Sequence, residues 1–520
     1  MDQTCSTGIS AGSSEIPEVK TPFSYFERYL KDDFFEDMAE FSNRKYVLLK
    51  GRSLNTNGPE IRKYWGASIA AALVGFPKIR MCWDRRTRFP LIADNISRDR
   101  VYTLRNSLKI VDDNAVSDLK KEDRFWKVRP MLARVRNACL ENPRPKEISI
   151  DEQMIPFHGQ IRMKQFVRGK PQPVGLKNFV MTTTSGLPLD FLMYEGKGKE
   201  IVSGKAPVPE KLDVGGRVVL KLCDSLPAGS SIFIDRYFTS VPVLETLLSH
   251  RNIFCTGTIM SNRIPRSVEL KRDNEMKREG RGCHDQVVRL DDKMSIVKWY
   301  DNRPIYLGST ICGVSPIEEC RRWSKKDSAY IQVPRPYIVK MYNTNMGGVD
   351  LSDRILSKYA MRNRTKKWTV RVLHHFFDFA VAAAWIEYRY AAQLNKWPSK
   401  DILSYFLFKM DIAENLIYYL REREVQQEHE EESDDAEEED DDVEQAGSKR
   451  KRRATQSLPP KAARIQNAIH MPEMMHNQQK SRSRCRFPGC SSVTYIRCTQ
   501  CKVFLCFTTE RNCFRNFHMK

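Results

Sequence analysis

This sequence of 520 residues lacks the features of a secreted or membrane protein. No apolar run approaches the ~20 residues of a transmembrane helix, so we expect no membrane partner. The first residues, MDQTCSTGISAGSSEIPEVK, have no charged start followed by an apolar stretch, so we expect no secretory signal. The 14 cysteines are therefore expected in a reducing compartment, where metal binding is favoured over disulfides.

Acidic residues are outnumbered by basic ones, 65 to 86, and one segment supplies many of them. The stretch from Glu430 to Asp442 holds eleven acidic residues, so the net charge of +21 becomes +32 when it is set aside. Such a basic chain attracts polyanions by counterion release, and nucleic acid is the expected partner. A ribosome-like or merely soluble basic protein has a similar composition. The length predicts three or four domains, and a hydrophobic fraction of 41% suffices for their cores.

The N-terminal part is expected to be helical and the next part to contain a sheet. From about Thr21 to Pro145 apolar residues recur at helical spacing, and FWKVRPMLARVRNACL carries Arg and Lys opposite its apolar face. That basic stripe is either a solvated face or part of a DNA-facing surface. Near Pro145 the pattern changes: EISID alternates as a strand does, KNFVMTTT and LDFLMY are separated by Ser185-Gly186, VVLKLCDSL is helical, and SIFIDRYF is strand-like. This order predicts a mixed α/β sheet.

Three further segments follow this sheet. Residues from about Cys255 to Pro336 are rich in Lys and Arg, with the strand-like pieces SIVKWYD and PIYLGST, and we expect an inserted β-rich module. A strongly helical segment runs from Trp368 to Tyr390. Residues 425–480 form a linker whose basic run, SKRKRR at 448–453, predicts nuclear import and hence a nuclear location. The same run also suits a nonspecific phosphate-binding tail.

Three aspartates stand at the ends of apolar runs: Asp151 after EISI, Asp235 after SIFI and Asp350 after MGGV. Asp353 lies three residues beyond Asp350, on the same face if a helix begins there. Such carboxylates suit two Mg²⁺ ions about 3.5–4 Å apart, which bind the attacking and leaving oxygens of a phosphodiester. Taken singly, an Asp at a strand end is usually a turn or cap residue, so the prediction depends on the motifs around it.

The last 36 residues hold six of the cysteines, and this spacing predicts Zn²⁺ binding. The candidate ligands are Cys485, Cys490, Cys498, Cys501, Cys506, Cys513 and His518. So small a unit is not expected to fold without metal. His374 and His375, on the long helical segment, are expected at the helix surface rather than among the ligands.

The segments SIDEQMIPFHG, FIDRYFTS and MYNTNMGGVDLSD resemble the three acidic motifs of piggyBac-family transposases, in the same order. The segments MCWDRRT, SRDRVYTLRNSLKIVDDN, KQFVRGKPQPVGLK and KKWTVRVLHHFFDFAVAAAW also resemble that family. The likeness covers about residues 21–425 and the cysteine-rich tail.

The resemblance implies an α/β multidomain fold in which a β-rich insertion interrupts an RNase H-like catalytic domain. It also implies a helical dimerisation and DNA-binding domain and a C-terminal cross-brace zinc finger. The implied order is a disordered leader at 1–20, the first helical part at 21–145, the first catalytic part at 146–254, the insertion at 255–336, the last catalytic part at 337–364, the second helical part at 365–424, the linker at 425–480 and the zinc finger at 481–520.

For function, the resemblance implies a metal-dependent DNA transposase with Asp151, Asp235, Asp350 and Asp353 as Mg²⁺ ligands. Members of the family cut transposon ends by hydrolysis, form a hairpin through the freed hydroxyl, and join the element to a TTAA target. The implied partners are the terminal inverted repeats, the target DNA and a second copy of the chain. The implied DNA-binding residues are Arg134, Lys366, Lys367 and Arg371.

In the family's cross-brace, Cys498, Cys501, Cys513 and His518 would form one zinc site, and Cys485, Cys490 and Cys506 the other, which is one ligand short. Arg236 follows the second aspartate where Asn is common in the family, and the N-terminal region is shorter than in many members. A domesticated DNA-binding protein without transposition activity is therefore the alternative. A zinc-finger transcription regulator with an unrelated core accounts for the charge and the tail, but not for the three long motifs.

Overall fold

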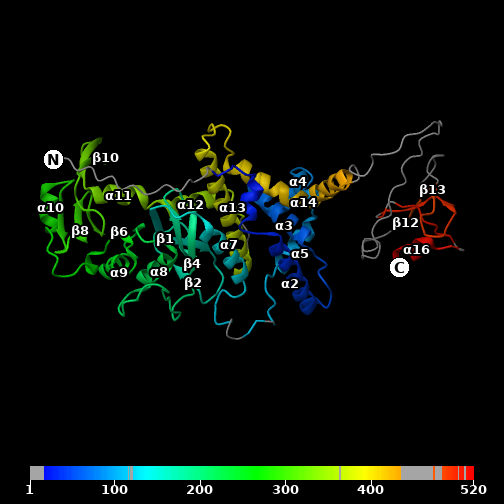
Figure 1. Cartoon of the computed structure of the whole chain (residues 1–520), viewed down its shortest axis with the longest axis horizontal. Coiled ribbons are helices and arrows are strands. Elements are labelled where there is room, and N and C mark those ends of the chain that lie inside the picture. Colours follow the sequence, from blue (N-terminus) through cyan, green and yellow to red (C-terminus); the bar gives the residue numbers. More distant parts are fainter. Residues whose placement is uncertain are drawn as a thin grey trace. The chain divides into compact units, whose positions relative to one another are not determined.

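The computed structural model of the chain describes residues 17–114, 116–117, 121–361, 365–434, 472–474, 483–499, 501, 503–508 and 511–519. The chain divides into two compact units, Met1–Ser433 and Asp434–Lys520 (Figure 1). The predicted leader up to residue 16 and the predicted import signal at 448–453 lie outside the described residues. The predicted linker at 425–480 also lies largely outside the described residues. Its first residues, however, belong to helix α14 (Tyr405–Asp434). Within the described ranges, no helix has the length and apolar character that crossing a membrane requires.

The region before the sheet is helical, as predicted. Its helices begin at residues suited to that position: Thr21 Oγ1 accepts from the Ser24 amide at 3.3 Å, and Asn57 Oδ1 accepts from the Glu60 amide at 2.9 Å. The elements are α1 (Pro22–Glu27), α2 (Asp32–Lys50), α3 (Gly58–Val74), η1 (Ile79–Trp83), α4 (Pro90–Ala93), α5 (Arg98–Ser107) and α7 (Arg129–Glu141).

The first unit contains one nine-stranded mixed sheet in the order β2-β3-β1-β5-β6-β9-β8-β7, with β4 paired to β3. Strands β1, β5 and β6 are parallel neighbours, and the other pairs are antiparallel. The strands are β1 (Glu147–Pro156), β2 (Lys164–Phe166), β3 (Val174–Thr183), β4 (Pro188–Met193), β5 (Ser231–Ile234), β6 (Phe254–Thr258), β7 (His284–Val288), β8 (Ser295–Tyr300) and β9 (Pro304–Ser309). The strand predictions for EISID, KNFVMTTT and LDFLMY are confirmed, whereas the strand in SIFIDRYF ends at Ile234.

The segment predicted as an inserted module continues this sheet. Strand β9 pairs with β6, so β7, β8 and β9 extend the sheet beyond its parallel centre. Strand β6 spans the predicted boundary at residue 255. Strands β10 (Glu318–Ser324) and β11 (Ala329–Arg335) form a separate two-stranded ribbon. The short helices of this segment are η3 (Ser261–Arg263) and α10 (Asp273–Glu279).

Helices cover both faces of the central strands. On one face, α8 (Val214–Leu222), η2 (Cys223–Ser225) and α9 (Val241–Arg251) pack on Ile148 and Ile150 of β1. On the other face lie α11 (Tyr337–Asn345) and α12 (Gly348–Ser357). Helix α12 starts directly on the sheet, because a Cβ at Gly348 would lie 2.2 Å from the carbonyl oxygen of Thr183 and 2.5 Å from Ser149 Oγ. The Gly-Gly pair in NMGGVD therefore permits a close approach of helix to strand.

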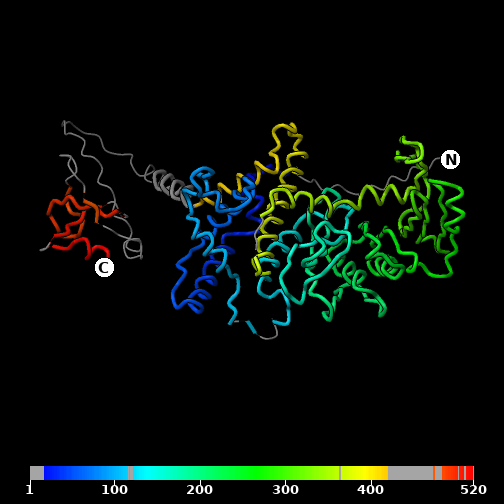
Figure 2. The backbone as a smooth tube through the Cα atoms, turned by 180° about the vertical axis from the view of Figure 1, so that it is seen from behind, coloured from blue at the N-terminus to red at the C-terminus, as the bar shows by residue number. Residues whose placement is uncertain are grey.

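Helix α13 (Trp368–Leu394) lies between the N-terminal helices and the sheet in both views (Figures 1 and 2). Its Phe377 stacks on Trp65 of α3 with ring centroids 4.2 Å apart, and residues of both elements share one core with β1 and β3. The predicted surface positions of His374 and His375 are wrong, since both side chains are buried. Because protein surrounds this part of the helix on all sides, its polar residues are buried as well and are not exposed to solvent.

The second unit is small and is built around its cysteines. Strand β12 (Pro472–Met474) pairs with β15 (Ile496–Cys498), and β13 (Ser483–Arg484) pairs with β14 (Val493–Thr494). Helix α16 (Cys513–Met519) follows. The core consists of cysteine side chains together with Val503, Leu505, Phe514 and Phe517. So few apolar residues give little stability by themselves, and the thiols occupy the centre.

Candidate carboxylate and thiolate metal sites

The adjacent parallel strands β1 and β5 bring two of the predicted aspartates together. Ile150 pairs with Ile234, so Asp151 within β1 and Asp235 directly after β5 are the next residues along the two segments. One carboxylate oxygen each of Asp151, Glu152 and Asp235 lie within 4.8 Å of one another. Two residues 84 positions apart in the chain thus share one site because β1 and β5 are adjacent parallel strands, although β1 continues past Asp151 to Pro156 and does not end there as predicted.

Glu152 is the residue of this cluster that the sequence reasoning missed. It follows Asp151 directly, and the alternation of a strand predicts that it points to the opposite face. Its side chain is nevertheless buried, and its Oε2 has no hydrogen-bond partner. A buried carboxylate oxygen without a partner is costly unless a cation lies beside it. The signal available in the sequence was the pair of adjacent acids inside an otherwise apolar strand.

Helix α12 places the other two predicted aspartates beside this cluster. Asp350 lies in the first turn and is exposed, whereas Asp353 is partly buried and accepts a hydrogen bond from Gln153 Nε2 of β1. The prediction that a helix begins there, with both carboxylates on one side, is confirmed. The three-carboxylate group itself does not include Asp350 or Asp353. Both carboxylates are close enough to act electrostatically on Lys170, which contacts that group.

Lys170 is the cation within the carboxylate cluster. Its Nζ donates to the carbonyl oxygen of Glu152 at 3.0 Å and lies 3.8 Å from Asp151 Oδ2 and 3.9 Å from Glu152 Oε1. Burial disfavours its charge, but the surrounding carboxylates outweigh burial and raise the pKa of Lys170. A second lysine, Lys177, is buried over the Tyr237 ring at 4.0 Å, and burial lowers its pKa.

The acidic groups outnumber these two lysines. Burial raises the pKa of Asp151 well above its ordinary value, raises that of Asp235, and raises that of Asp353 to about 6. Five carboxylates therefore face two ammonium groups, and the unpartnered Oε2 of Glu152 lies among them. All available donor atoms are oxygens, which suits hard divalent cations such as Mg²⁺. The residues present fit a divalent metal site.

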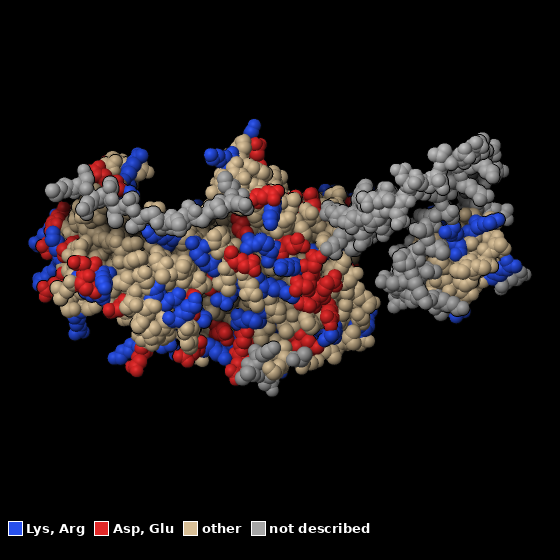
Figure 3. All heavy atoms as spheres, in the orientation of Figure 1, with Lys and Arg blue, Asp and Glu red and all other residues tan. Residues whose placement is uncertain are grey.

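The predicted DNA-binding residues differ in their surroundings. Arg134 is paired with Asp33 at 2.9 Å and with Asp37 at 2.6 Å, so its charge is neutralised within the chain. Arg371 Nε donates to the carbonyl oxygen of Pro156 at 3.0 Å, and burial lowers its pKa. Lys367 Nζ donates to the carbonyl oxygen of Asn106, and Lys366 is exposed. Basic and acidic side chains are interspersed on the face of the first unit that Figure 3 shows. DNA contact by these residues stays a prediction.

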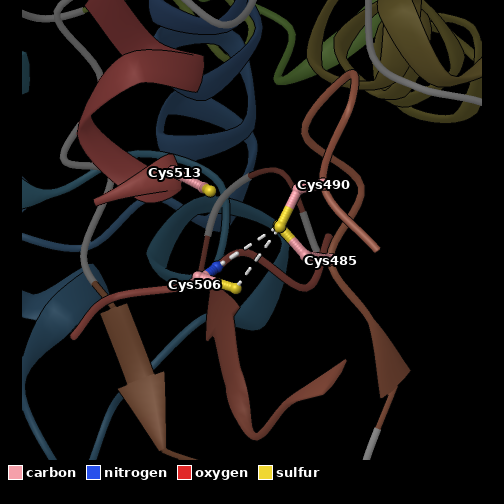
Figure 4. A group of neighbouring side chains, drawn as sticks. All are labelled: Cys485, Cys490, Cys506 and Cys513. Carbon is pink, nitrogen blue, oxygen red and sulfur yellow. Dashed lines mark hydrogen bonds between the residues drawn. The ribbon is translucent and has the colours of Figure 1, made fainter. Parts of the chain in front are cut away.

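Four thiols of the second unit form one candidate zinc site. Cys485, Cys490, Cys506 and Cys513 have sulfur atoms that all lie within 4.8 Å of one another, and they point toward a common centre (Figure 4). The Sγ atoms of Cys490 and Cys506 are 3.9 Å apart, and the Cys506 amide donates to Cys485 Sγ at 3.4 Å. Hydrogen bonds from Ser492 lower the pKa of Cys490 to about 6, which favours its thiolate. Four thiolates in this arrangement fit a tetrahedral Zn²⁺ ion.

The second candidate zinc site consists of Cys498, Cys501 and His518. Cys501 Sγ lies 3.5 Å from His518 Nε2, and the Cys501 amide donates to Cys498 Sγ at 3.3 Å. His518 Nδ1 is 2.7 Å from the carbonyl oxygen of Phe514, an arrangement that leaves Nε2 to bind a metal. Within the described part of this unit, the group of Cys498, Cys501 and His518 is therefore the one that lacks a fourth ligand.

The predicted division of the ligands is wrong for Cys513, which belongs with Cys485, Cys490 and Cys506 rather than with His518. Cys513 and His518 both lie on α16. At about 100° per residue, five residues turn a helix by about 140° beyond a full turn, so the two side chains project to different sides. Closeness along the sequence therefore gave the wrong pairing.

Comparisons with known proteins agree with this architecture. The profile of the family described as Transposase IS4 matches residues 21–385, and that of the Tc5 transposase C-terminal domain matches residues 464–512. Human PiggyBac transposable element-derived protein 3 is 32% identical over 375 residues, which cover 71% of this chain and 61% of that protein. Human PiggyBac transposable element-derived protein 2 is 29% identical over 397 residues, which cover 74% of this chain and 65% of that protein.

The chain thus spans less than two thirds of the length of both human relatives, at 61% and 65%. A solved structure, titled as the cryo-EM structure of the piggyBac transposase synaptic complex with hairpin DNA, is similar with a TM-score of 0.64. Its sequence is 18% identical, and the match covers 94% of this chain and 96% of that chain. At this identity the likeness concerns the fold.

Proposed function

Because the chain belongs to the piggyBac family of transposases, we propose that it is a DDE/D-type DNA transposase whose catalytic centre is the carboxylate cluster. The observation that carries this proposal is the convergence of Asp151 and Asp235 from adjacent parallel strands, with α12 packed beside them. Strands that deliver carboxylates to a common edge are what an RNase H-like catalytic domain requires. The segment at 255–336 is then its insertion, and the helices of 21–145 and 365–424 are the dimerisation and DNA-binding part.

Asp151, Asp235, Asp350 and Asp353 are the proposed Mg²⁺ ligands, and we add Glu152 to this set. When bound, two Mg²⁺ ions would stabilise the charge on the scissile phosphate and favour attack by water or by a terminal hydroxyl. The chain's own contribution is positioning. The sheet fixes Asp151, Glu152 and Asp235, and Asp350 is exposed at the first turn of α12, where substrate can reach it. Lys170 offsets part of the acidic charge while no cation is bound.

The proposed substrate is double-stranded DNA at the ends of a transposon, and the proposed target is TTAA. Hydrolysis frees a terminal hydroxyl, which attacks the opposite strand to form a hairpin that is reopened before integration. No covalent link to the protein is needed, so no Ser, Tyr or Cys nucleophile is assigned. The similar solved structure is named as a synaptic complex with hairpin DNA, which supports DNA ends as the substrate of this chain. The proposed assembly on those ends is a homodimer.

The C-terminal unit is proposed to bind Zn²⁺ and to contact the transposon ends. Four thiols in one cluster and two thiols with an imidazole in the other support this role. A protein acting on chromosomal DNA is proposed to work in the nucleus, with the basic run at 449–453 as its import signal.

A second candidate is a domesticated DNA-binding protein without transposition activity. Arg236 favours it, because this exposed guanidinium follows Asp235 at a position where the family commonly has Asn. The two human relatives are named as transposable element-derived proteins, which supports the same possibility.

A cell-based excision assay separates the two candidates. A reporter gene is interrupted by a cassette bounded by the DNA ends that flank this gene in its genome, and restoration of the reporter is measured. We expect seamless excision by the native chain and none by Asp151→Asn, Asp235→Asn or Asp350→Asn. Asp292→Asn, at an exposed acidic residue in the turn between β7 and β8 and outside all of the family-like segments, serves as the matched control and should excise normally. Binding of the ends without excision by the native chain would leave the domesticated protein as the function.

A further inference from the structure

A chain of buried side chains leads from the centre of the helical part to the carboxylate site. His375 Nε2 of α13 lies 2.9 Å from Gln153 Oε1 of β1, and Gln153 Nε2 donates to Asp353 Oδ1 of α12. His375 and Gln153 are both buried. Three elements from different parts of the sequence therefore meet at one amide group, two residues after Asp151.

The surroundings of this amide determine which way it points. Asn178 Nδ2 of β3 donates to Gln153 Oε1 at 3.3 Å, and His375 Nε2 is directed at the same oxygen. The carboxylate of Asp353 is an acceptor, so it requires the amide nitrogen. The amide is satisfied in one orientation only, with its oxygen toward His375 and Asn178 and its nitrogen toward Asp353.

His375 is suited to hold that orientation. It is fully buried, and burial lowers its pKa to about 3, so it is neutral and carries a single N–H. Because Gln153 presents an oxygen, that proton must lie on Nε2. The neighbouring His374 differs: its Nδ1 lies 2.8 Å from the carbonyl oxygen of Val370 and its Nε2 lies 2.9 Å from the Tyr64 hydroxyl. His374 therefore connects α13 to itself and to α3, and no hydrogen bond of the described structure links it to Gln153.

We propose that His375 is a positioning residue, which acts through Gln153 to hold the carboxylate of Asp353 in the orientation that divalent-metal binding requires. This inference rests on the proposed function, because it assumes that Asp353 belongs to the metal site. It makes α13, which lies at the centre of the helical part, a support of the catalytic centre. Groups that orient metal ligands in this way affect metal affinity about 10–100-fold.

The test measures Mn²⁺ affinity of the full-length, zinc-loaded chain by electron paramagnetic resonance, without DNA. His375→Leu removes the donor, and Gln153→Leu removes the connecting amide. We expect each to weaken Mn²⁺ binding about 10-fold, and we expect the double variant to be no weaker than the single ones. His375→Gln keeps a donor near the Nε2 position and should recover much of the affinity. His374→Leu is the matched control, since it removes buried hydrogen bonds one residue away and should leave the affinity unchanged.

Unfolding measured by circular dichroism shows whether each variant folds, and Gln153→Leu keeps the test decisive if His375→Leu does not fold. Equal Mn²⁺ affinity in the native chain and in Gln153→Leu would overturn the inference, as would equal losses in His374→Leu and His375→Leu. If Asp353→Asn weakens Mn²⁺ binding but the His375 and Gln153 variants do not, the proposed metal site stands and only the positioning role fails. If the native chain has no Mn²⁺ site sensitive to Asp151→Asn, both proposals fail.

Discussion

Gly348 offers the sharpest test of how the proposed catalytic centre is assembled. A Cβ at this position would lie 2.2 Å from the carbonyl oxygen of Thr183, whereas ordinary contact begins at 3.4 Å. In Gly348→Ala the start of α12 must therefore retreat from the sheet by about 1 Å, because a strand carbonyl cannot yield as a flexible side chain does. Asp350 and Asp353 lie two and five residues further along the same helix and move with it.

Overpacking of this kind costs about 1–3 kcal/mol, and we expect the upper end because the clash is with backbone. The intrinsic gain of alanine over glycine in a helix, about 1 kcal/mol at most, offsets only part of this cost. Gly348→Ala should lower the urea midpoint of the first unit and weaken Mn²⁺ binding, as measured by circular dichroism and electron paramagnetic resonance. Loss of DNA excision should follow from the displaced carboxylates.

Gly347→Ala is the matched control. Its backbone has φ −76°, which alanine adopts readily, and a Cβ there would have no atom within 4 Å. We expect native stability and native Mn²⁺ affinity for this variant. If Gly348→Ala matches Gly347→Ala in both measurements, α12 does not press against β1 and β3 as described, and the geometric reasoning is refuted.

Three further predictions concern stability and metal content. Lys409→Met leaves the buried carboxylate of Asp378 without its ion-pair partner, so the free energy of unfolding in urea should fall by about 3–5 kcal/mol, and Asp378→Asn in the same chain should restore part of it. Burial raises the pKa of Glu387 from 4.5 to about 7, so the folded chain keeps a proton that the unfolded chain has released. Thermal stability should therefore decline as the pH rises from about 4.5 to about 7, and Glu387→Gln should flatten this decline; an unchanged slope would contradict it. For zinc, Cys485→Ser with Cys513→Ser should lose no more Zn²⁺ than either single variant, whereas Cys498→Ser with Cys513→Ser should lose both ions, as measured by a colorimetric chelator; the reverse result would restore the division expected from the sequence.

Periodicity and motif position predicted the regular elements well. The alternation of EISID, the turn at Ser185-Gly186 and the helix from Trp368 all correspond to observed elements, because these signals are local. The expectation that Asp151 and Asp235 lie at strands also depends on local information, since each follows a short apolar run, although β1 continues past Asp151 to Pro156. What joins them is the parallel pairing of β1 and β5, which is common in mixed sheets.

The features that the sequence did not disclose depend on long-range packing. Cys513 was assigned to the wrong ligand set because the side of α16 on which a residue projects is invisible in its spacing. His374 and His375 are buried because elements from distant parts of the chain surround α13. The ion pairs of Arg134 with Asp33 and Asp37 could not be foreseen either, because only the contact of α2 with α7 creates them. Glu152 was overlooked because strand alternation directs neighbours apart.

The order of the elements along the chain also determines when each of the proposed metal ligands is made during synthesis. Strand β1 emerges from the ribosome before β5, and α12 follows only after the whole segment that carries β7 to β11. Chains grow at about 5–20 residues per second, so the strand carboxylates are made well before Asp350 and Asp353 exist. The orienting contact from His375 comes later still, when α13 has been completed. A nascent or prematurely ended chain therefore carries an incomplete set of the proposed metal ligands, and the full set exists only once nearly all of the first unit has been made.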